Sequence, residues 1–168
     1  MIKAAADASE RFLLVLVLVI AAVGVAGPAP GRALAAGNGI DAALAVLGRA
    51  PIGPHGRRIA VLGDMLELGP DGPALHRGLV ESVIANAVDL VFCCGPLMRA
   101  LWEALPASRR GGYAEDAAAL EAQVVPAIRA GDVVMVKGSL GSRMGPIVKA
   151  LQRNYPRHET LEEVAAQG

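Results

Sequence analysis

The stretch Gly131-Asp-Val-Val-Met-Val-Lys-Gly-Ser139 contains four consecutive apolar residues, Val133–Val136, and then turns polar at a lysine, a glycine and a serine. A short, continuous apolar run bounded by turn residues is typical of a strand that is buried on both faces of a parallel sheet. A second run of the same kind, Ile59–Leu62, stops at Gly63-Asp64. Both runs predict central strands that end in a turn.

The rest of the chain after Arg58 alternates between apolar runs and helical patterns. Further strands are predicted at Val88–Cys93 and, more weakly, near Tyr113. Apolar residues at spacings of three and four predict helices that carry Leu75 to Ile84, Leu97 to Leu105, Ala117 to Ile128 and Met144 to Tyr155. Strands that alternate with helices of this length favour a parallel sheet covered on both faces. We therefore predict an α/β fold, a Rossmann-like three-layer domain with a mainly parallel sheet.

An apolar segment precedes this domain. After Lys3 and Arg11, residues 12–27 are uncharged, and small residues follow at 33–35, which is the outline of a signal peptide or a short membrane anchor. A strand over Leu13–Ile20 is an equal alternative, because periodicity does not separate the two. A short helix is expected at Ala42–Leu47. The predicted organisation is an apolar N-terminal segment at 1–37, a helix and linker at 38–57, the main domain at 58–155 and a polar tail at 156–168.

Composition narrows the classes of function. The 16 basic and 16 acidic residues cancel, and aromatic residues make up only 3% of the chain, so neither a global positive field nor stacking platforms favour nucleic-acid binding. The two cysteines, Cys93 and Cys94, are adjacent, which gives neither a disulfide framework nor the spacing of metal ligands. We expect no nucleic-acid partner and no metal site formed by this chain alone.

Three predicted turns fall at the carboxyl ends of strands, where ligands collect in open parallel sheets. They are Gly63-Asp64-Met65, Cys94-Gly95-Pro96 and Lys137-Gly138-Ser139. Asp64 and Glu67 are candidates to receive an ammonium group. Lys137, Ser139 and the backbone amides at the start of the last helix are candidates to hold a carboxylate or phosphate. This edge of the sheet therefore suits a zwitterionic amino acid or dipeptide.

Simpler roles are open for the same residues. Asp64 is equally well explained as a turn residue that caps local backbone groups. His76, on the polar flank of its helix, is more typical of a surface or capping histidine than of a general base. The dipeptide Gly-Lys occurs nowhere in the chain, so the phosphate-binding P-loop pattern is absent from it.

The order of two motifs resembles one family. They are Arg57-Arg-Ile-Ala-Val-Leu-Gly-Asp-Met-Leu-Glu-Leu-Gly69, followed by His76, and Gly131-Asp-Val-Val-Met-Val-Lys-Gly-Ser-Leu-Gly-Ser-Arg-Met144. Over about Ala42–Tyr155 the chain resembles the C-terminal domain of Mur ligases of the MurF type, which join D-alanyl-D-alanine to a UDP-muramoyl-tripeptide in peptidoglycan precursor synthesis. The resemblance implies ATP and Mg²⁺ as cofactors of the complete enzyme, the missing ligase domains as partners, and a cytoplasmic location.

The positions that match the family motifs are Gly63, Asp64, Met65, Glu67, His76, Lys137, Gly138 and Ser139. Asn38 is a weaker counterpart of an element that contacts ATP at the start of the family domain. The resemblance implies substrate-binding roles for the polar residues of this set, turn roles for the glycines, and no catalytic residue in this chain. A ligase fragment that is inactive alone is the leading hypothesis. A non-catalytic amino-acid or dipeptide binding module, membrane-tethered or exported through residues 12–27, is the alternative.

Overall fold

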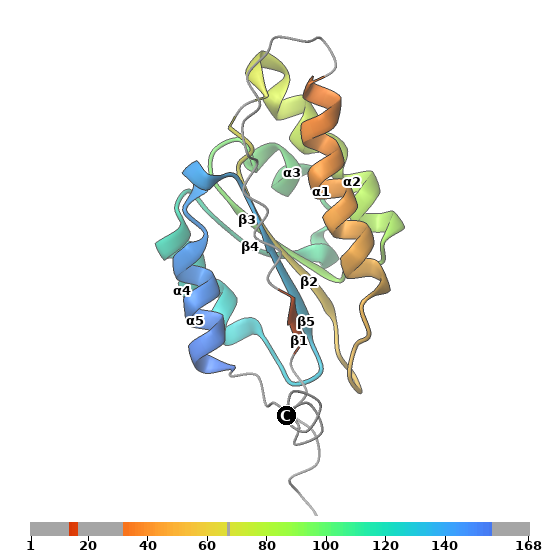
Figure 1. Ribbon diagram of the computed structural model, residues 1–168, viewed down its shortest axis with the longest axis vertical. Coiled ribbons are helices and arrows are strands. Elements are labelled where there is room, and N and C mark those ends of the chain that lie inside the picture. The colour runs from red at the N-terminus through yellow and green to blue at the C-terminus, as the bar shows by residue number, and fades with distance from the viewer. Residues whose placement is uncertain (1–13, 17–31, 67, 156–168) are drawn as a thin grey trace, which may run out of the picture.

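The computed structural model describes residues 14–16, 32–66 and 68–155. They form an α/β fold around one parallel sheet of five strands, in the order β1-β5-β2-β3-β4 (Figure 1). The strands are β1 (Leu14–Leu16), β2 (Arg58–Gly63), β3 (Leu90–Cys94), β4 (Arg110–Ala114) and β5 (Val133–Lys137). The α-helices are α1 (Arg32–Arg49), α2 (Gly72–Ala85), α3 (Arg99–Ala104), α4 (Ala117–Ala127) and α5 (Gly145–Asn154). The predicted α/β class and parallel sheet are confirmed.

Helices cover the sheet on both faces, so the domain has three layers (Figure 1). Along β5, Val133 and Met135 pack with residues of α1, α2 and α3, whereas Val134 and Val136 pack with residues of α4 and α5. Successive side chains of a strand point to opposite faces, so a strand buried on both faces must be apolar at every position. This is why the continuous apolar runs in the sequence identify the central strands correctly.

Strand β3 spans Leu90–Cys94 instead of the expected Val88–Cys93. Strand β3 begins at Leu90 rather than at Val88, because the amide of Val88 donates to the carbonyl of Val83 and so still belongs to the end of α2. The turn there places Ala87 in the left-handed region, with φ of 50°. An apolar residue buried behind a helix end is thus indistinguishable in sequence from the first residue of a strand.

Helix α1 is much longer than the predicted helix at Ala42–Leu47, since it spans Arg32–Arg49. Its buried face includes Ile40 and Leu44, which pack on the face of the sheet that α2 also covers. The expected boundary between residues 37 and 38 lies inside this helix. The alanine-rich and glycine-containing sequence ahead of Ala42 shows little apolar periodicity, which is why the first turns of α1 are missed in the sequence.

The apolar N-terminal segment contributes one short strand to the described structure. In β1, Leu14–Leu16 pair in parallel with Val133–Met135 of β5 at the edge of the sheet. This favours the strand interpretation for those three positions. The remainder of residues 12–27 lies outside the described residues, and within the described ones no helix is both long enough and apolar enough to cross a membrane.

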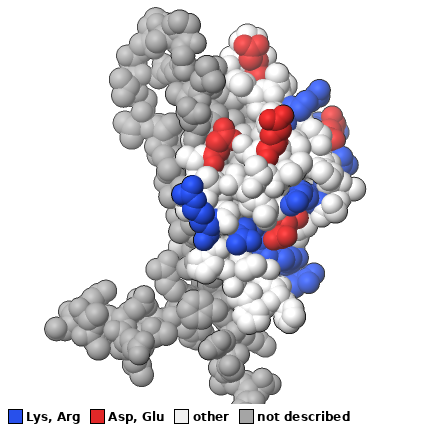
Figure 2. All heavy atoms as spheres, turned by 90° about the vertical axis from the view of Figure 1, so that its right-hand side faces the viewer, with Lys and Arg blue, Asp and Glu red and all other residues white. Residues whose placement is uncertain are grey.

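Charged side chains of both signs share the face of the molecule that lies to the right in Figure 1. Figure 2 shows acidic side chains interspersed among basic ones over the described part of this face. The distribution agrees with the cancelling charge of the whole chain. Because the charges of this face are mixed, charge acts locally rather than as one field over the molecule.

Candidate functional site

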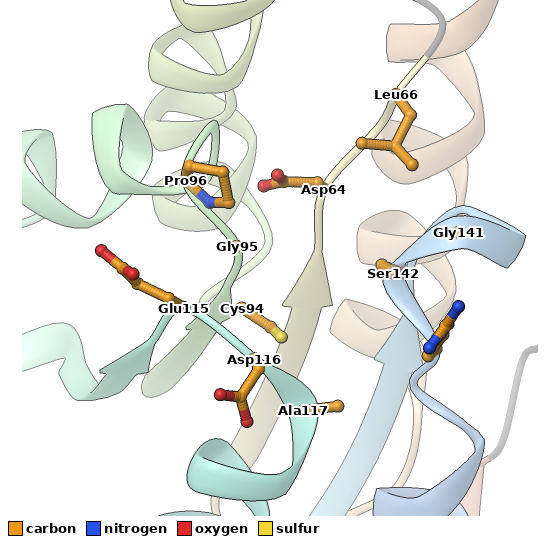
Figure 3. A pocket seen from close by; sticks show the side chains of 11 residues that line it. Asp64, Leu66, Cys94, Gly95, Pro96, Glu115, Asp116, Ala117, Gly141 and Ser142 are labelled. Atoms are coloured by element: carbon orange, nitrogen blue, oxygen red, sulfur yellow. The ribbon is translucent and has the colours of Figure 1, made fainter.

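A cavity of about 370 Å³ opens at the carboxyl ends of β2 and β3 and at the start of α4 (Figure 3). Its volume lies near the lower end of the range of roughly 300–1,000 Å³ that is typical of small-molecule sites. Its walls consist of Asp64, Leu66, Cys94, Gly95, Pro96, Glu115, Asp116, Ala117, Gly141, Ser142 and Arg143. This is the edge of the sheet at which the sequence predicts a ligand, and it has the size for a small metabolite.

Asp64 ties the turns around this cavity together. The residue is 3% exposed, and its carboxylate accepts hydrogen bonds from the backbone amides of Met98, at 2.8 Å, and Leu97, at 3.2 Å. Its backbone carbonyl accepts from the hydroxyl of Ser139, at 2.7 Å, and from the amide of that residue, at 3.1 Å. The carboxylate is thus engaged by the protein, which supports the simpler role of a turn residue that caps backbone groups.

We predict that Asp64→Asn lowers the free energy of unfolding by about 1–2 kcal/mol, because an amide nitrogen replaces one of the two acceptor oxygens of a buried, charge-assisted pair of hydrogen bonds. Urea-induced unfolding measures the change. Asp116→Asn is a matched control, since Asp116 caps α4 through the amide of Ala119 at 2.8 Å and asparagine is an equally good N-cap. Equal stabilities of the two variants would contradict the role given to Asp64.

His76 is buried in the first turns of α2, with no exposed surface, so the prediction of a surface position is wrong. Its Nε2 accepts from the amide of Met65 at 3.1 Å, and its Nδ1 lies 2.6 Å from the carbonyl of Gly72. These partners require the neutral tautomer that carries its proton on Nδ1. Because both nitrogens are occupied, His76 holds the loop after β2 against α2.

The glycines of the predicted site allow two strand ends to meet. A Cβ atom added at Gly138 would lie 2.4 Å from Oγ of Ser142 and 3.1 Å from Cα of Gly63. A Cβ atom at Gly63 would lie 2.7 Å from the same Oγ. Ser142 in turn donates to the carbonyl of Ser139 at 2.6 Å. Close backbone approach therefore explains both glycines.

Lys137 is the last residue of β5 and is 9% exposed. Burial lowers the pKa of its ammonium group from the usual value of 10.5. The alternation along β5 assigns it to the α1–α2 face with Met135, whereas Cys94, in the cavity wall, packs on the opposite face. Lys137 is not among the residues that line the cavity, so its predicted contact with a substrate carboxylate stays a prediction.

The side chains of two other predicted site residues are not described. Glu67 lies outside the described residues. The backbone of Asn38 belongs to α1, but its side chain is not described. Their assigned roles in ammonium and ATP contact therefore stay predictions.

Three charged residues of the cavity were missed by sequence reasoning. Glu115 and Asp116 follow β4 directly, and Figure 3 shows them across the cavity from Gly141 and Ser142. Arg143 comes next in the chain after Ser142 and has left-handed backbone angles, φ 49° and ψ 41°. The acidic pair follows the weakest predicted strand, and Arg143 lies four residues after Ser139, beyond the predicted Lys-Gly-Ser turn. Position after a strand end was the available signal for the acidic pair.

The cysteines do not supply a nucleophile. Burial is the main cause that raises the pKa of Cys93 to about 12 and that of Cys94, in the cavity wall, to about 11. Both thiols therefore stay protonated near neutral pH, and the thiol is far less nucleophilic than the thiolate. Among the described residues, no group of three or more His, Cys, Asp or Glu side chains is arranged to hold a metal ion.

The chain is thus a parallel, three-layer α/β domain with a small cavity at the carboxyl ends of its strands. Residues 35–140 match the model of the family "Mur ligase, glutamate ligase domain". This match covers more than half of the chain, which therefore belongs to the Mur ligase family.

A curated relative supports the assignment. The chain is 35% identical over 117 residues to UDP-N-acetylmuramoyl-tripeptide–D-alanyl-D-alanine ligase of Escherichia coli (strain K12), a match that covers 68% of this chain and 24% of the relative. The chain thus spans about a quarter of the length of that enzyme.

Solved structures show the same fold. The MurF ligase of Thermotoga maritima, solved in complex with ADP, matches with a TM-score of 0.57 and 22% identity over 70% of this chain and 26% of its own length. MurF of Acinetobacter baumannii matches with a TM-score of 0.59 and 20% identity over 70% of this chain and 25% of its own. At these identities the structures support the fold.

Proposed function

We propose that this chain acts as the C-terminal domain of an ATP-dependent ligase that joins D-alanyl-D-alanine to UDP-N-acetylmuramoyl-tripeptide in peptidoglycan precursor synthesis. The observation that carries the proposal is the 35% identity with the Escherichia coli enzyme of that name. The cavity at the strand ends supports it, because it has the size for a dipeptide and charged residues of both signs in its walls. A reaction that uses ATP and a nucleotide-linked precursor favours a cytoplasmic location.

ATP is implied by the family, but the described cavity does not fit a triphosphate. Glu115 and Asp116 are both exposed acids in its wall, and Asp64 adds a third carboxylate. Like charges disfavour polyphosphate in such a site. We therefore assign to this chain the binding of the incoming dipeptide and closure over the reaction centre, and we assign the nucleotide to a site outside this cavity.

A domain exchange tests the proposed function. Residues 32–155 would replace the C-terminal domain of the Escherichia coli ligase, and the chimera would be assayed for phosphate release that depends on tripeptide precursor and D-alanyl-D-alanine together. Turnover well above that of the E. coli enzyme lacking its C-terminal domain is expected. A folded chimera that hydrolyses ATP without forming the pentapeptide would contradict the proposal.

We also predict that the 168-residue chain by itself forms no pentapeptide product, because phosphoryl transfer requires a phosphate-binding loop and a positioned metal ion, and the chain contains no P-loop sequence. Product detection by mass spectrometry after incubation with ATP, Mg²⁺ and both substrates gives the answer. Turnover by the isolated chain would show that the domain is a complete enzyme.

A further inference from the structure

The opposite signs of charge in the cavity come from different parts of the chain. Glu115 and Asp116 belong to the connection between β4 and α4, and Arg143 belongs to the turn between β5 and α5. Figure 3 shows that the acidic connection and the η3 turn (Leu140–Ser142) flank the cavity from different sides. The charges are thus arranged across the cavity rather than gathered in one cluster.

These charges are available to a ligand. Among the described residues, neither Arg143 nor Glu115 takes part in an ion pair, and all three charged side chains are exposed. Asp116 uses one carboxylate oxygen, Oδ1, to cap α4. Asp64, by contrast, is buried and bonded to two backbone amides. A ligand in the cavity therefore meets acid on one side and a guanidinium on the other.

The backbone at Arg143 is strained. A residue other than glycine with φ of 49° and ψ of 41° occupies the left-handed region, which costs on the order of 1–2 kcal/mol for a side chain with a Cβ atom. His55 and Ala87 have the same kind of angle, φ of 58° and 50°, outside the cavity lining, so the angle alone assigns no role. It makes glycine the least disruptive replacement for Arg143 in a test.

We infer that the cavity orients a zwitterionic dipeptide, with its carboxylate at Arg143 and its ammonium group at Glu115 and Asp116. The inference rests on the proposed function for the identity of the ligand, and it adds the polarity of binding and the residues that determine it. In this inference Arg143, Glu115 and Asp116 take the place of Asp64 and Ser139 as the ligand contacts. Asp64 and Ser139 make hydrogen bonds within the protein instead. A guanidinium pairs with a carboxylate through two parallel hydrogen bonds, which fixes direction as well as affinity.

The test compares three probes on the purified chain by amide chemical-shift titration. They are D-alanyl-D-alanine, its C-terminal amide, which lacks the carboxylate, and its N-acetyl derivative, which lacks the ammonium group. Arg143→Gly is expected to weaken binding of D-alanyl-D-alanine roughly tenfold, between the small effect of an exposed ion pair and the larger effect of a shielded one. The same change is expected to leave binding of the amide nearly unaltered.

The acidic side is tested in the same way. The double variant Glu115→Gln, Asp116→Asn keeps the cap of α4. It is expected to weaken binding of D-alanyl-D-alanine and of the amide, while binding of the N-acetyl derivative stays the same. Each protein variant is thus expected to lose affinity only for probes that carry the ligand group it contacts. This is the pairwise coupling that a double-mutant cycle measures.

Stability separates binding from structure. Arg143→Gly removes an exposed side chain and relieves the left-handed backbone, so the melting temperature is expected to stay or rise. His55→Gly is a matched control, because His55 is an exposed residue with φ of 58° outside the cavity lining. This control should change the melting temperature alike and leave all affinities unchanged.

The inference is overturned if the wild-type chain binds none of the probes, if Arg143→Gly affects all three probes equally, or if it lowers affinity and melting temperature together. A domain exchange without ligation, combined with the expected pattern of affinities, would refute the proposed function and keep the inference. Ligation by the chimera, combined with unaltered affinity of the Arg143 variant, would do the reverse.

Discussion

Asp132→Ala is expected to lower the free energy of unfolding by about 3 kcal/mol, because it removes a fully buried carboxylate and leaves the partly buried guanidinium of Arg57 and two backbone amides without their acceptor. The side chain of Asp132 has no exposed surface, and its Oδ2 lies 2.6 Å from Nη2 of Arg57. Oδ1 accepts from Nε of the same arginine at 3.1 Å and from its backbone amide at 2.9 Å. The amide of Arg129 donates to Oδ2 at 2.8 Å.

This large effect follows from what the carboxylate connects. It joins the residue before β2 to the turn before β5, the two neighbouring strands at the centre of the sheet. Arg57 also donates to the carbonyl of Ala127 at 2.8 Å, so the end of α4 is included. Chemical denaturation followed by circular dichroism measures the loss. Glu103→Ala is the control, since its ion pair with Arg99 is 61% exposed on both sides and should contribute almost nothing.

Asp132 lies at the amino-terminal ends of the strands, opposite the cavity, so a small reduction in temperature should keep its variant folded and its dipeptide affinity unchanged. A variant as stable as the wild type would show that the attraction within the ion pair only offsets the cost of desolvating its charges. Such a balance is seen when both partners of a buried pair are replaced, but it is not expected when one partner is removed.

The sequence predicted the central strands better than the helices because a strand buried on both faces is apolar at every position. Val133–Val136 and Ile59–Leu62 are apolar at every position, and no solvent-exposed element tolerates such runs. Helix α1 was underestimated, since its first turns are rich in alanine and glycine and carry little periodicity. The weak strand near Tyr113 was found only approximately, because β4 is an edge strand with exposed Arg110 and Gly111.

The sequence predicts the edge of the sheet at which the cavity lies, but not which polar groups there are engaged within the protein. Topology alone brings the carboxyl ends of parallel strands to one edge, so the turns at Asp64, Gly95 and Ser139 were expected to meet, and they are joined by backbone hydrogen bonds. Which polar groups are engaged within the protein depends on geometry that no spacing reveals. Asp64 looks like a ligand contact in sequence, and in the structure its carboxylate in the cavity wall also accepts hydrogen bonds from the amides of Leu97 and Met98.

Gly95→Ala is expected to lower the free energy of unfolding by about 2–4 kcal/mol, the sum of a strained backbone and a disrupted cap. Gly95 has φ of 106°, which a residue with a Cβ atom rarely adopts, and its amide donates to the carbonyl of Ala114 at 2.9 Å. A Cβ atom here would lie 2.4 Å from Cγ of Asp64 and 2.6 Å from each of its carboxylate oxygens. That carboxylate has no room to retreat, because two backbone amides hold it in a buried position.

Adding Asp64→Ala to Gly95→Ala separates the two contributions. If the clash with the carboxylate matters, the double variant loses less stability than the sum of the single changes, since the second change removes the group that the first one strikes. Additive losses would assign the whole effect of Gly95→Ala to the backbone angle. Gly78→Ala is the control, because a Cβ atom at Gly78, within α2, meets no atom within 4 Å, and alanine favours a helix over glycine. That control should be neutral or stabilising, and a comparable loss there would show that the fold tolerates no added methyl group at all and that the cap at Asp64 is not the cause.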